Sequence, residues 1–404
     1  MTKIKIGLIK EQKIPVDKRV PMTPAQCAEA MEAFPELEIV VQSSDIRCFK
    51  DIDYTEAGVK VVKDLSDCDV LMGVKEVPKK QLIENKTYFF FSHTIKEQPY
   101  NRDLLKTIIK KNIRLIDYEV LTDTNGKRII AFGRYAGIVG AYNGIWTFGQ
   151  RYNLFNIRRA HRCFDLEDLK REFSKVKLPA IKIALTGGGR VSKGAMEVLH
   201  GMNIQKVTPA EYLEENFKGP VFAQLNSRDY HYHKDGIPFS RNEFYKRPEH
   251  FKSDFLKYAY QTDLLIAGAY WDPGSPVLFS REQSTGHDFR IRIIADITCD
   301  IEGSIPSTKM PTTIEDPIYD YNPSDDSVEK ALSDEGNITV MAVDNLPCEL
   351  PRDASEDFGK ELISNVLPQF WNNDKNDILK KATITDQGTL TDAYKYLSNY
   401  AQIK

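Results

Sequence analysis

The sequence predicts an α/β protein built from two parallel-sheet domains. In the first third of the chain, a short apolar run rich in Ile, Val and Phe is repeatedly followed by ionisable residues and then by a segment of helical character. This alternation is typical of βαβ units, in which helices join parallel strands. A second series of apolar runs surrounds a glycine-rich turn at residues 187–194, which indicates a second α/β layer.

The expected strands of the first domain each end in charged or titratable side chains. These strands are predicted at residues 4–9, 70–74, 88–91 and 113–116. The residues that follow them are, in the same order, Lys10 and Glu11, Lys75 and Glu76, Ser92 and His93, and Asp117 and Glu119. Ligands of open parallel sheets bind beyond the carboxyl ends of the strands, so these residues are expected to converge on one crevice. Taken singly, each of them is more often a solvated loop charge.

The glycine turn is the strongest local motif. Gly187 and Gly189 have the spacing of a dinucleotide fingerprint, with Ser192 at the third-glycine position, and a strand precedes the turn while a helix follows it. This order favours a Rossmann-like dinucleotide site over a purely structural turn. The acidic residue that usually binds the ribose is absent from residues 204–209, which leaves both NAD and NADP open. Lys206 is a candidate for a 2′-phosphate, and a solvated lysine is an equally good interpretation.

The remaining segments suggest the domain organisation. The glycine-rich stretch at residues 131–150 is interpreted as a passage between domains whose helix packs very closely against another surface. Residues 222–263 and 317–337 are polar and lack clear periodicity, so both are interpreted as surface excursions. We predict one domain from residues 1–133 plus 345–404 and another from residues 134–344, with an active-site cleft between them.

Composition and charge exclude several classes of protein. With 41% hydrophobic residues, 28% charged residues and a net charge of -3, the chain has a globular composition and no sequence-wide basic field for nucleic acid or an anionic membrane. Lysines interrupt the first apolar stretch and no run could cross a bilayer, so we expect a cytoplasmic protein. The six cysteines lack metal-binding spacing and are expected to be reduced. His231 and His233 have no evident third ligand, so we expect an exposed strand or loop there and no metal site.

Motifs spread along nearly the whole chain match one known family in order. They are KRVPMTP at residues 18–24, GVKEVP at 73–78, FFSHTIK at 90–96, GKRIIAFGRYAG at 126–137, TGGGRVSKGA at 186–195, ADITCDIEGSI at 295–305 and MAVDNLPCELPRDAS at 341–355. On these motifs the chain resembles lysine-forming saccharopine dehydrogenase and, more closely, the lysine-ketoglutarate reductase domain of bifunctional lysine-degrading enzymes. Both groups belong to the alanine dehydrogenase and transhydrogenase superfamily.

The resemblance implies an NAD- or NADP-dependent oxidoreductase that reversibly joins L-lysine and 2-oxoglutarate into saccharopine through an imine. It implies that Lys75 and His93 are acid/base groups, tuned by Glu76 and Glu119. The residues that it implies for substrate binding are Arg19, Arg128, Phe132 and Asp344. Those that it implies for cofactor binding are Gly187, Gly188, Gly189, Arg190, Val191, Asp296, Asp344 and Leu346. The expected partners are these small molecules, without nucleic acid or membrane, in a monomer or small homo-oligomer.

The proposed chemistry by itself needs these residue types. Arginine holds a carboxylate through two parallel hydrogen bonds, and histidine is already poised for proton transfer near neutral pH, whereas lysine needs a lowered pKa. Two alternatives stay open: an alanine dehydrogenase-like oxidoreductase acting on a free amino acid, and a non-catalytic dinucleotide sensor or interaction protein. The presence of Lys75, His93, Arg19 and Arg128 together argues against the sensor, which needs no such combination.

Overall fold

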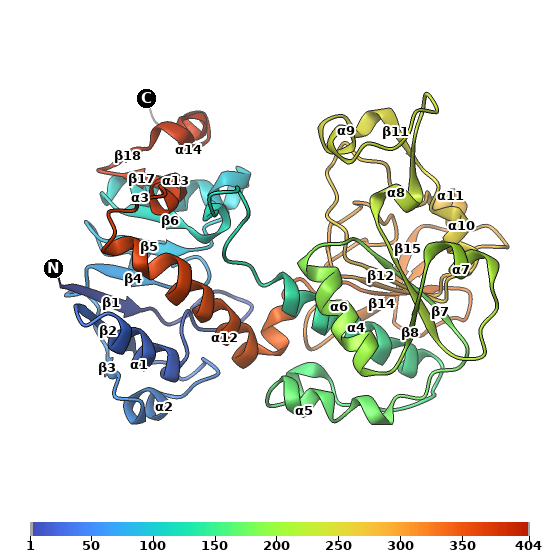
Figure 1. Cartoon of the computed structure of the whole chain (residues 1–404), viewed down its shortest axis with the longest axis horizontal. Helices are drawn as coiled ribbons and strands as arrows, with labels where there is room; N and C mark the ends of the chain where they lie inside the picture. The colour runs from blue at the N-terminus through green and yellow to red at the C-terminus, as the bar shows by residue number, and fades with distance from the viewer. Residues whose placement is uncertain (1–2, 403–404) are drawn as a thin grey trace. The chain divides into compact units, whose positions relative to one another are not determined.

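The computed structural model describes residues 3–402, and the chain divides into two compact units (Figure 1). The first unit contains the residues up to Phe132 and those from Pro351 onward, and the second is Gly133–Leu350. The segment 345–350, which the sequence reading placed in the first domain, lies in the second unit. Within residues 3–402, no helix combines the length and the apolar character that a membrane span requires.

The first unit is built on an eight-stranded sheet. Six neighbouring strands of this sheet are parallel, and the C-terminal part of the chain adds two antiparallel strands at one edge. The spatial order is β18 (Thr389–Leu390), β17 (Thr383–Asp386), β6 (Arg114–Asp117), β5 (Thr87–Phe90), β4 (Val70–Met72), β1 (Ile4–Leu8), β2 (Leu37–Gln42) and β3 (Lys60–Val62). The helices are α1 (Pro24–Ala33), α2 (Asp51–Glu56), α3 (Arg102–Lys110), α12 (Pro351–Glu361), α13 (Ile378–Ala382) and α14 (Ser398–Ala401). The four strands that the sequence predicted correspond to β1, β4, β5 and β6.

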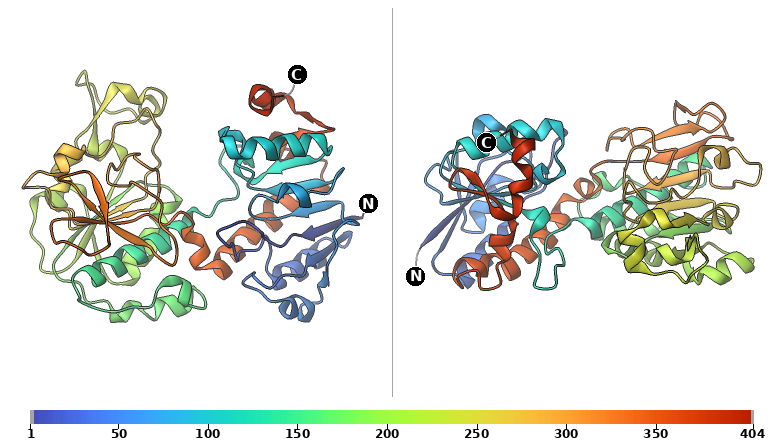
Figure 2. Two further views of the ribbon diagram at one scale, coloured as in Figure 1. Left: turned by 180° about the vertical axis from the view of Figure 1, so that it is seen from behind. Right: turned by 90° about the horizontal axis from the view of Figure 1, so that it is seen from above.

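Both faces of this sheet are covered. Successive side chains of a strand point to opposite faces, so one strand contributes to the buried clusters on both sides. In and just after β5, Phe89 and Phe91 belong to one buried cluster, whereas Tyr88 and Phe90 belong to another. The first cluster includes Phe358 of α12, and Figure 1 shows α12 and α1 along the same face of the sheet. The second cluster contains side chains of α3, which Figure 2 shows on the opposite face. This sandwich fixes the carboxyl ends of β1, β4, β5 and β6, where the predicted site residues begin.

The second unit also contains an eight-stranded, mostly parallel sheet, so the predicted fold class of two α/β domains is confirmed. Its order is β15 (Ser327–Glu329), β14 (Ile318–Asn322), β16 (Ile338–Met341), β13 (Ile293–Asp296), β12 (Leu264–Ala267), β7 (Lys182–Thr186), β9 (Val221–Leu225) and β8 (Gln205–Val207). Among the described strands of this sheet, the antiparallel pairings are those of β14 with β16 and with β15. Its helices are α4 (Gly133–Arg151), α5 (Leu166–Lys170), α6 (Arg190–Gly201), α7 (Pro209–Glu214), α8 (Ser227–Tyr230), α9 (Arg241–Lys246), α10 (Leu256–Ala259) and α11 (Arg281–Ser284).

The two stretches interpreted as surface excursions are instead partly core, so that interpretation is wrong. The 317–337 stretch supplies β14 and β15, and Asp320 of β14 is fully buried. Asp320 can be buried because its carboxylate accepts hydrogen bonds from the Thr339 hydroxyl (2.8 Å) and the Ser333 backbone N–H (2.9 Å). Composition alone cannot reveal this pairing, since the acidic residue satisfies its charge only in the folded sheet.

The 222–263 stretch contains β9 and a separate two-stranded hairpin of β10 (His231–His233) and β11 (Phe251–Ser253). His231 and His233 are buried, 8% and 4% exposed, whereas Tyr232 between them is exposed. The expectation that both histidines lie on an exposed segment is therefore wrong. The reason is the two-residue period of a strand, which turns both imidazoles to the same covered side.

Candidate active site

The first feature of the site is a buried carboxylate that joins the ends of β1 and β4. Glu11 follows β1, and its two carboxylate oxygens accept hydrogen bonds from the backbone N–H groups of Val74 (2.6 Å) and Lys75 (2.9 Å). A side chain at Gly73 would come within 3.3 Å of the Glu11 carboxylate, so glycine lets these strand ends approach. Burial, together with the charge of Asp17, raises the pKa of Glu11 to about 8. Glu11 thereby fixes the backbone from which the Lys75 side chain projects.

Lys75 is half-buried, and this environment changes its acidity. Burial lowers the pKa of Lys75 below its ordinary value of 10.5, and the positive charge of Arg19 lowers it further. The carboxylates of Asp17 and Glu76 act in the opposite direction but do not outweigh these effects. A lysine with a lowered pKa can accept a proton at a lower pH than a solvated lysine can.

His93 and Glu76 form the closest contact among the predicted catalytic residues. The Nδ1 atom of His93 lies 2.6 Å from Glu76 Oε1, and the Nζ of Lys13 donates to Glu76 Oε2 at 2.8 Å. Burial alone would raise the pKa of Glu76, but these two hydrogen bonds outweigh it and lower the value to about 2. Glu76 is therefore an anion that orients the imidazole. His93 has a φ of 52°, an uncommon backbone conformation for a non-glycine residue that is found at functional sites.

Arg19 lies beside these groups with its charge already paired. Its Nε and Nη2 atoms donate to the two oxygens of Asp17 at 3.0 and 2.5 Å, and both side chains are almost fully buried. The guanidinium carbon lies 4.0 Å from the centre of the Phe132 ring, so two residues predicted to bind substrate are in contact. A substrate carboxylate at Arg19 stays a prediction, and it would have to share the guanidinium with Asp17. The sequence reading did not identify Asp17.

Glu119 and Arg128 form a second charged group at the end of β6. Glu119 Oε1 lies 3.7 Å from Arg128 Nη1 and 3.3 Å from the Nζ of Lys96, which the sequence reading also missed. The Arg128 guanidinium carbon lies 5.3 Å from the centre of the Phe91 ring, and its Nε donates to the carbonyl of Ile130 at 2.9 Å. The Oε2 atom of Glu119 is buried and has no hydrogen-bond partner among residues 3–402. A buried acceptor of this kind is costly unless a ligand or water supplies a donor.

In the second unit, the glycine turn joins β7 to α6 as the motif predicts. Gly187 has a φ of +99°, and a side chain there would come within 3.0 Å of the Gly268 carbonyl, so this position requires glycine. Gly189 precedes α6, and a methyl group there would meet no atom within 4 Å. No side chain caps the first turn of α6, which includes Arg190 and Val191. Backbone amides at such a helix start suit a pyrophosphate, so these residues fit a dinucleotide.

The remaining predicted cofactor residues are placed differently. Asp296, at the end of β13, is buried, and its two oxygens accept hydrogen bonds from the hydroxyls of Thr298 and Thr308, each at 2.7 Å. Asp344 is exposed beyond β16, and Leu346 is buried in the short helix Leu346–Glu349. For Asp296 these bonds supply a structural role, whereas an exposed Asp344 is open to a ligand. Their contact with a cofactor stays a prediction.

Residues 204–209, where the acidic residue that usually binds the ribose is absent, include the edge strand β8. The strand that pairs with β7 on this side is β9. Lys206 in β8 donates to Gln224 at 2.9 Å, and Gln224 of β9 in turn donates to the Gly187 carbonyl at 3.1 Å. Residues that follow β9, beginning with Asn226, therefore border the glycine turn. A side-chain carbon at Gly188 would come within 2.6 Å of the Asn226 amide oxygen.

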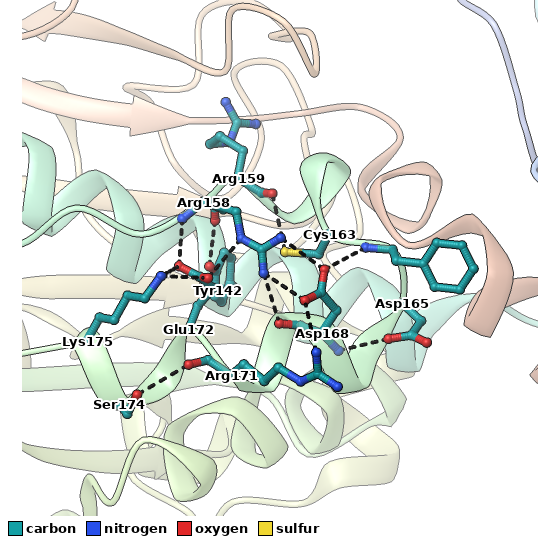
Figure 3. Close-up of polar contacts among 11 residues, drawn as sticks. Tyr142, Arg158, Arg159, Cys163, Asp165, Asp168, Arg171, Glu172, Ser174 and Lys175 are labelled. Atoms are coloured by element: carbon teal, nitrogen blue, oxygen red, sulfur yellow. Dashed lines mark hydrogen bonds and ion pairs between the residues drawn. The ribbon is translucent and has the colours of Figure 1, made fainter.

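A cavity of about 640 Å³ in the second unit is lined by none of the residues assigned to chemistry. Arg158, Glu172 and Lys175 contribute to its wall, and Figure 3 shows how they are paired. The Arg158 guanidinium donates to Asp168 and Glu172, each at 2.8 Å, and Lys175 donates to Glu172 at 2.8 Å. Because these charges neutralise one another, this part of the wall has a structural explanation, and we locate the proposed chemistry in the clusters above.

Comparison with known protein families finds a similarity near the start of the chain. Residues 7–139 match the family described as alanine dehydrogenase/PNT, N-terminal domain. This part of the chain is therefore similar to the N-terminal domain of that family. The matched residues include Lys75, Glu76, His93 and Glu119, which are the candidate acid/base groups.

Relatives of the whole chain agree with the resemblance that the motifs indicated. The mitochondrial alpha-aminoadipic semialdehyde synthase of Mus musculus is 31% identical over 89% of this chain, which spans 44% of the length of that protein. The saccharopine dehydrogenase (NAD(+), L-lysine-forming) of Yarrowia lipolytica is 25% identical over 90% of this chain and 92% of its own length. A solved L-alanine dehydrogenase shares the fold with a TM-score of 0.66 at 17% identity, covering 98% of this chain and 99% of that one. The predicted relationship to these dehydrogenases is confirmed.

Proposed function

We propose that this chain is an NAD(P)-dependent oxidoreductase acting on a CH–NH group, which reversibly joins L-lysine and 2-oxoglutarate into saccharopine. The observation that carries the proposal is the cluster in which Glu76 contacts His93 and follows the half-buried Lys75 at the end of β4. A non-catalytic dinucleotide-binding protein has no need of a lysine with a lowered pKa beside a carboxylate-oriented histidine. The relative named saccharopine dehydrogenase (NAD(+), L-lysine-forming) supports lysine as the amine.

The groups of the first unit are suited to the proton transfers of this reaction. The lysine ε-amine adds to the ketone of 2-oxoglutarate to give a carbinolamine, which loses water to give an imine. His93 would donate the proton that leaves with the hydroxyl, and Glu76 would hold the imidazole in position. In the oxidative direction, Lys75 would accept a proton from the secondary amine of saccharopine. Saccharopine carries several carboxylates, for which Arg19 and Arg128 are the proposed partners.

The second unit would hold the dinucleotide. Gly187, Gly188 and Gly189, with the amides of Arg190 and Val191, would hold its pyrophosphate. When bound, a nicotinamide cofactor supplies or accepts the hydride. The proposal therefore assigns proton transfer to the first unit and dinucleotide binding to the second.

An initial-rate assay of the purified chain tests the proposed function. We expect oxidation of NADPH or NADH only when lysine and 2-oxoglutarate are both present. Turnover with pyruvate and ammonia instead would favour an alanine dehydrogenase-like enzyme, a reaction for which the solved alanine dehydrogenase provides a likeness of fold alone. Cofactor binding measured by fluorescence, without turnover on either substrate set, would favour the sensor and would defeat the proposal.

Arg228 is expected to favour NADP over NAD. It lies beyond β9, next to the residues that border the glycine turn, and its side chain is 73% exposed. Its Nε lies 3.8 Å from the Asp229 carboxylate, which also accepts from the Asn226 backbone N–H at 2.7 Å and so acts as a helix cap. We expect Arg228→Ala to raise the KM for NADPH about tenfold to a hundredfold, the effect of losing a hydrogen bond to a charged group, with little change for NADH.

Lys206→Ala is the matched control for Arg228→Ala, because Lys206 is a cation on β8 whose Nζ already donates to Gln224. We expect this variant to change the KM values of both cofactors by less than about twofold. An equal loss for NADH and NADPH in Arg228→Ala would contradict the assignment of this residue to the 2′-phosphate. A rise in KM for NADPH alone in Lys206→Ala would instead assign the 2′-phosphate contact to Lys206 on β8.

A further inference from the structure

Two imidazoles and a carboxylate meet in the small hairpin of the second unit. The hairpin of β10 and β11 encloses α9 and the short helix Pro248–His250, and Figure 1 shows α9 and β11 together at one end of that unit. His233 ends β10, Glu243 lies in α9, and His250 directly precedes β11. One possible ligand atom from each residue lies within 4.8 Å of the other two. Spacings of 10 and 7 residues hid this convergence from the sequence reading, which found no third ligand for His233.

The geometry inside the cluster suits a small tetrahedral cation. His233 Nε2 and His250 Nδ1 each lie 3.3 Å from the same oxygen of Glu243, Oε1. Ligands bound to a tetrahedral ion at about 2.0–2.1 Å stand about 3.3 Å apart, which is the separation that these two pairs already have. The His250 and Glu243 side chains are 37% and 31% exposed, so the remaining histidine–histidine separation can shorten without moving the core.

A second observation points independently to a ligand. His233 is 4% exposed, and its Nε2 atom is buried without a hydrogen-bond partner among residues 3–402. A buried polar atom without a partner is costly, and native structures supply one in nearly all cases. This nitrogen lies 3.3 Å from Oε1 of Glu243, the same oxygen that lies 3.3 Å from Nδ1 of His250. The cluster therefore contains one donor atom that the described structure leaves unsatisfied.

We propose that His233, Glu243 and His250 bind a Zn²⁺ ion, with water completing the coordination. Two imidazole nitrogens and one carboxylate oxygen are ligands that zinc prefers, and magnesium and calcium prefer oxygen alone. The site is distinct from the proposed chemistry, since these residues lie outside the family match at residues 7–139 and outside the glycine turn. The proposal replaces the expectation of no metal site in this chain.

Carboxylates are in place to support both imidazoles as ligands. A histidine that binds zinc through one nitrogen normally donates its other N–H to a carboxylate or a carbonyl. For His250, Nε2 lies 3.9 Å from Glu249. For His233, Nδ1 accepts from the Asp235 backbone N–H at 3.1 Å and lies 3.8 Å from the Asp235 carboxylate. When zinc binds Nε2 of His233, the proton of the neutral imidazole moves to Nδ1. The Nδ1 atom could then no longer accept from the Asp235 backbone N–H and would instead donate to the Asp235 carboxylate.

The ion would stabilise the hairpin and take no part in the reaction. Each strand of the hairpin has three residues and α9 has six, and elements this short are marginal without additional support. The three proposed ligands come from three different elements, so one ion would tie all of them together. Aromatic rings enclose one side of the site, with the ring of Phe251 centred 5.1 Å from that of His233.

Metal titration of the full chain, after treatment with a chelator, tests the proposal. We expect one equivalent of Zn²⁺ by calorimetry, a rise in unfolding temperature on addition of Zn²⁺, and visible absorption of Co²⁺ in the intensity range of four- or five-coordinate ions. His250→Ala and the conservative variant Glu243→Gln should each weaken Zn²⁺ binding by about tenfold to a hundredfold or more. Loss of a residue that only hydrogen-bonds to a metal ligand already has an effect of about this size. His287→Ala, which removes a fully exposed histidine of the same unit, is the control and should bind as the parent does.

Two outcomes would overturn the proposal. The first is the absence of stoichiometric binding in the parent chain, which would mean that Glu243 serves only as an ion-pair partner of the two histidines. The second is unchanged binding in Glu243→Gln and His250→Ala, which would locate the ion elsewhere, for example at a cysteine thiol. Glu243→Gln keeps the size of the side chain, so loss of binding in that folded variant cannot be attributed to unfolding.

Discussion

Lys75→Met is expected to lower turnover of saccharopine about a hundredfold while leaving the fold intact. Methionine keeps the length of the half-buried side chain but can neither accept nor donate the proton. In the oxidative direction Lys75 acts as a base only when neutral, so protonation at low pH should slow the parent enzyme. Because burial and Arg19 lower the pKa of Lys75, this acid limb should lie below the ordinary lysine value of 10.5. The limb should disappear from the pH–rate profile of Lys75→Met.

His93→Gln is the companion variant, and we expect a similar loss, about a hundredfold. Lys80→Met is the control, because Lys80 is exposed in the same loop region and has no role in the proposed chemistry. Circular dichroism and urea unfolding would establish that all three variants fold. Unchanged turnover in both Lys75→Met and His93→Gln would remove the assignment of the site. A pH–rate profile that kept its acid limb in Lys75→Met would remove the role of Lys75 as the base.

The strand-end rule explains why the sequence could predict that Glu76 and His93 lie close together. The apolar runs before Lys75 and His93 are β4 and β5, which are neighbouring parallel strands, and parallel strands bring their carboxyl ends to one edge. That rule needs only the hydrophobic pattern and therefore placed Glu76 and His93 together. Whether these residues act as the resemblance implies stays a prediction.

The partners that the sequence reading missed come from irregular segments. Lys13 and Asp17 lie in the loop after β1, where the chain has no helical or strand periodicity to indicate which way a side chain points. Their roles are set by tertiary contacts, with Glu76 for Lys13 and Arg19 for Asp17. Charge alone could not identify them among the many ionisable residues of the chain.

The order of strands in the second sheet could not be predicted from the sequence for a different reason. The sequence shows that β8 follows α6, and a doubly wound pattern normally pairs such a strand with the first one. Here β9 occupies that position, because β8 is a three-residue edge strand that pairs with β9 alone among the described strands. Order along the chain does not determine order in a sheet, so the residues that face the ribose could not be assigned without coordinates.

Gly137→Ala is expected to destabilise the second unit by about 3 kcal/mol or more. A methyl group at Gly137 of α4 would lie 1.9 Å from the carbonyl oxygen of Val191 in α6. The contact is reciprocal, because a methyl group at Gly194 would lie 2.0 Å from the Arg134 carbonyl oxygen. Both obstacles are backbone atoms, which cannot rotate away as a side chain can, so the two helices would have to separate. Urea unfolding followed by tryptophan fluorescence would measure the loss.

Gly189→Ala is the matched control, because a methyl group at that position meets no atom within 4 Å. Its stability should change by about 1 kcal/mol or less, the usual cost at a helix cap, whereas its affinity for dinucleotide should fall because the methyl group would occupy the space of the pyrophosphate. The pair thus separates two uses of glycine in one short region: Gly137 and Gly194 allow helix packing, and Gly189 keeps space for a ligand. If Gly137→Ala were as stable as the parent chain, the close contact between α4 and α6 would be wrong. The position of the glycine turn, which leads into α6, would then be wrong as well.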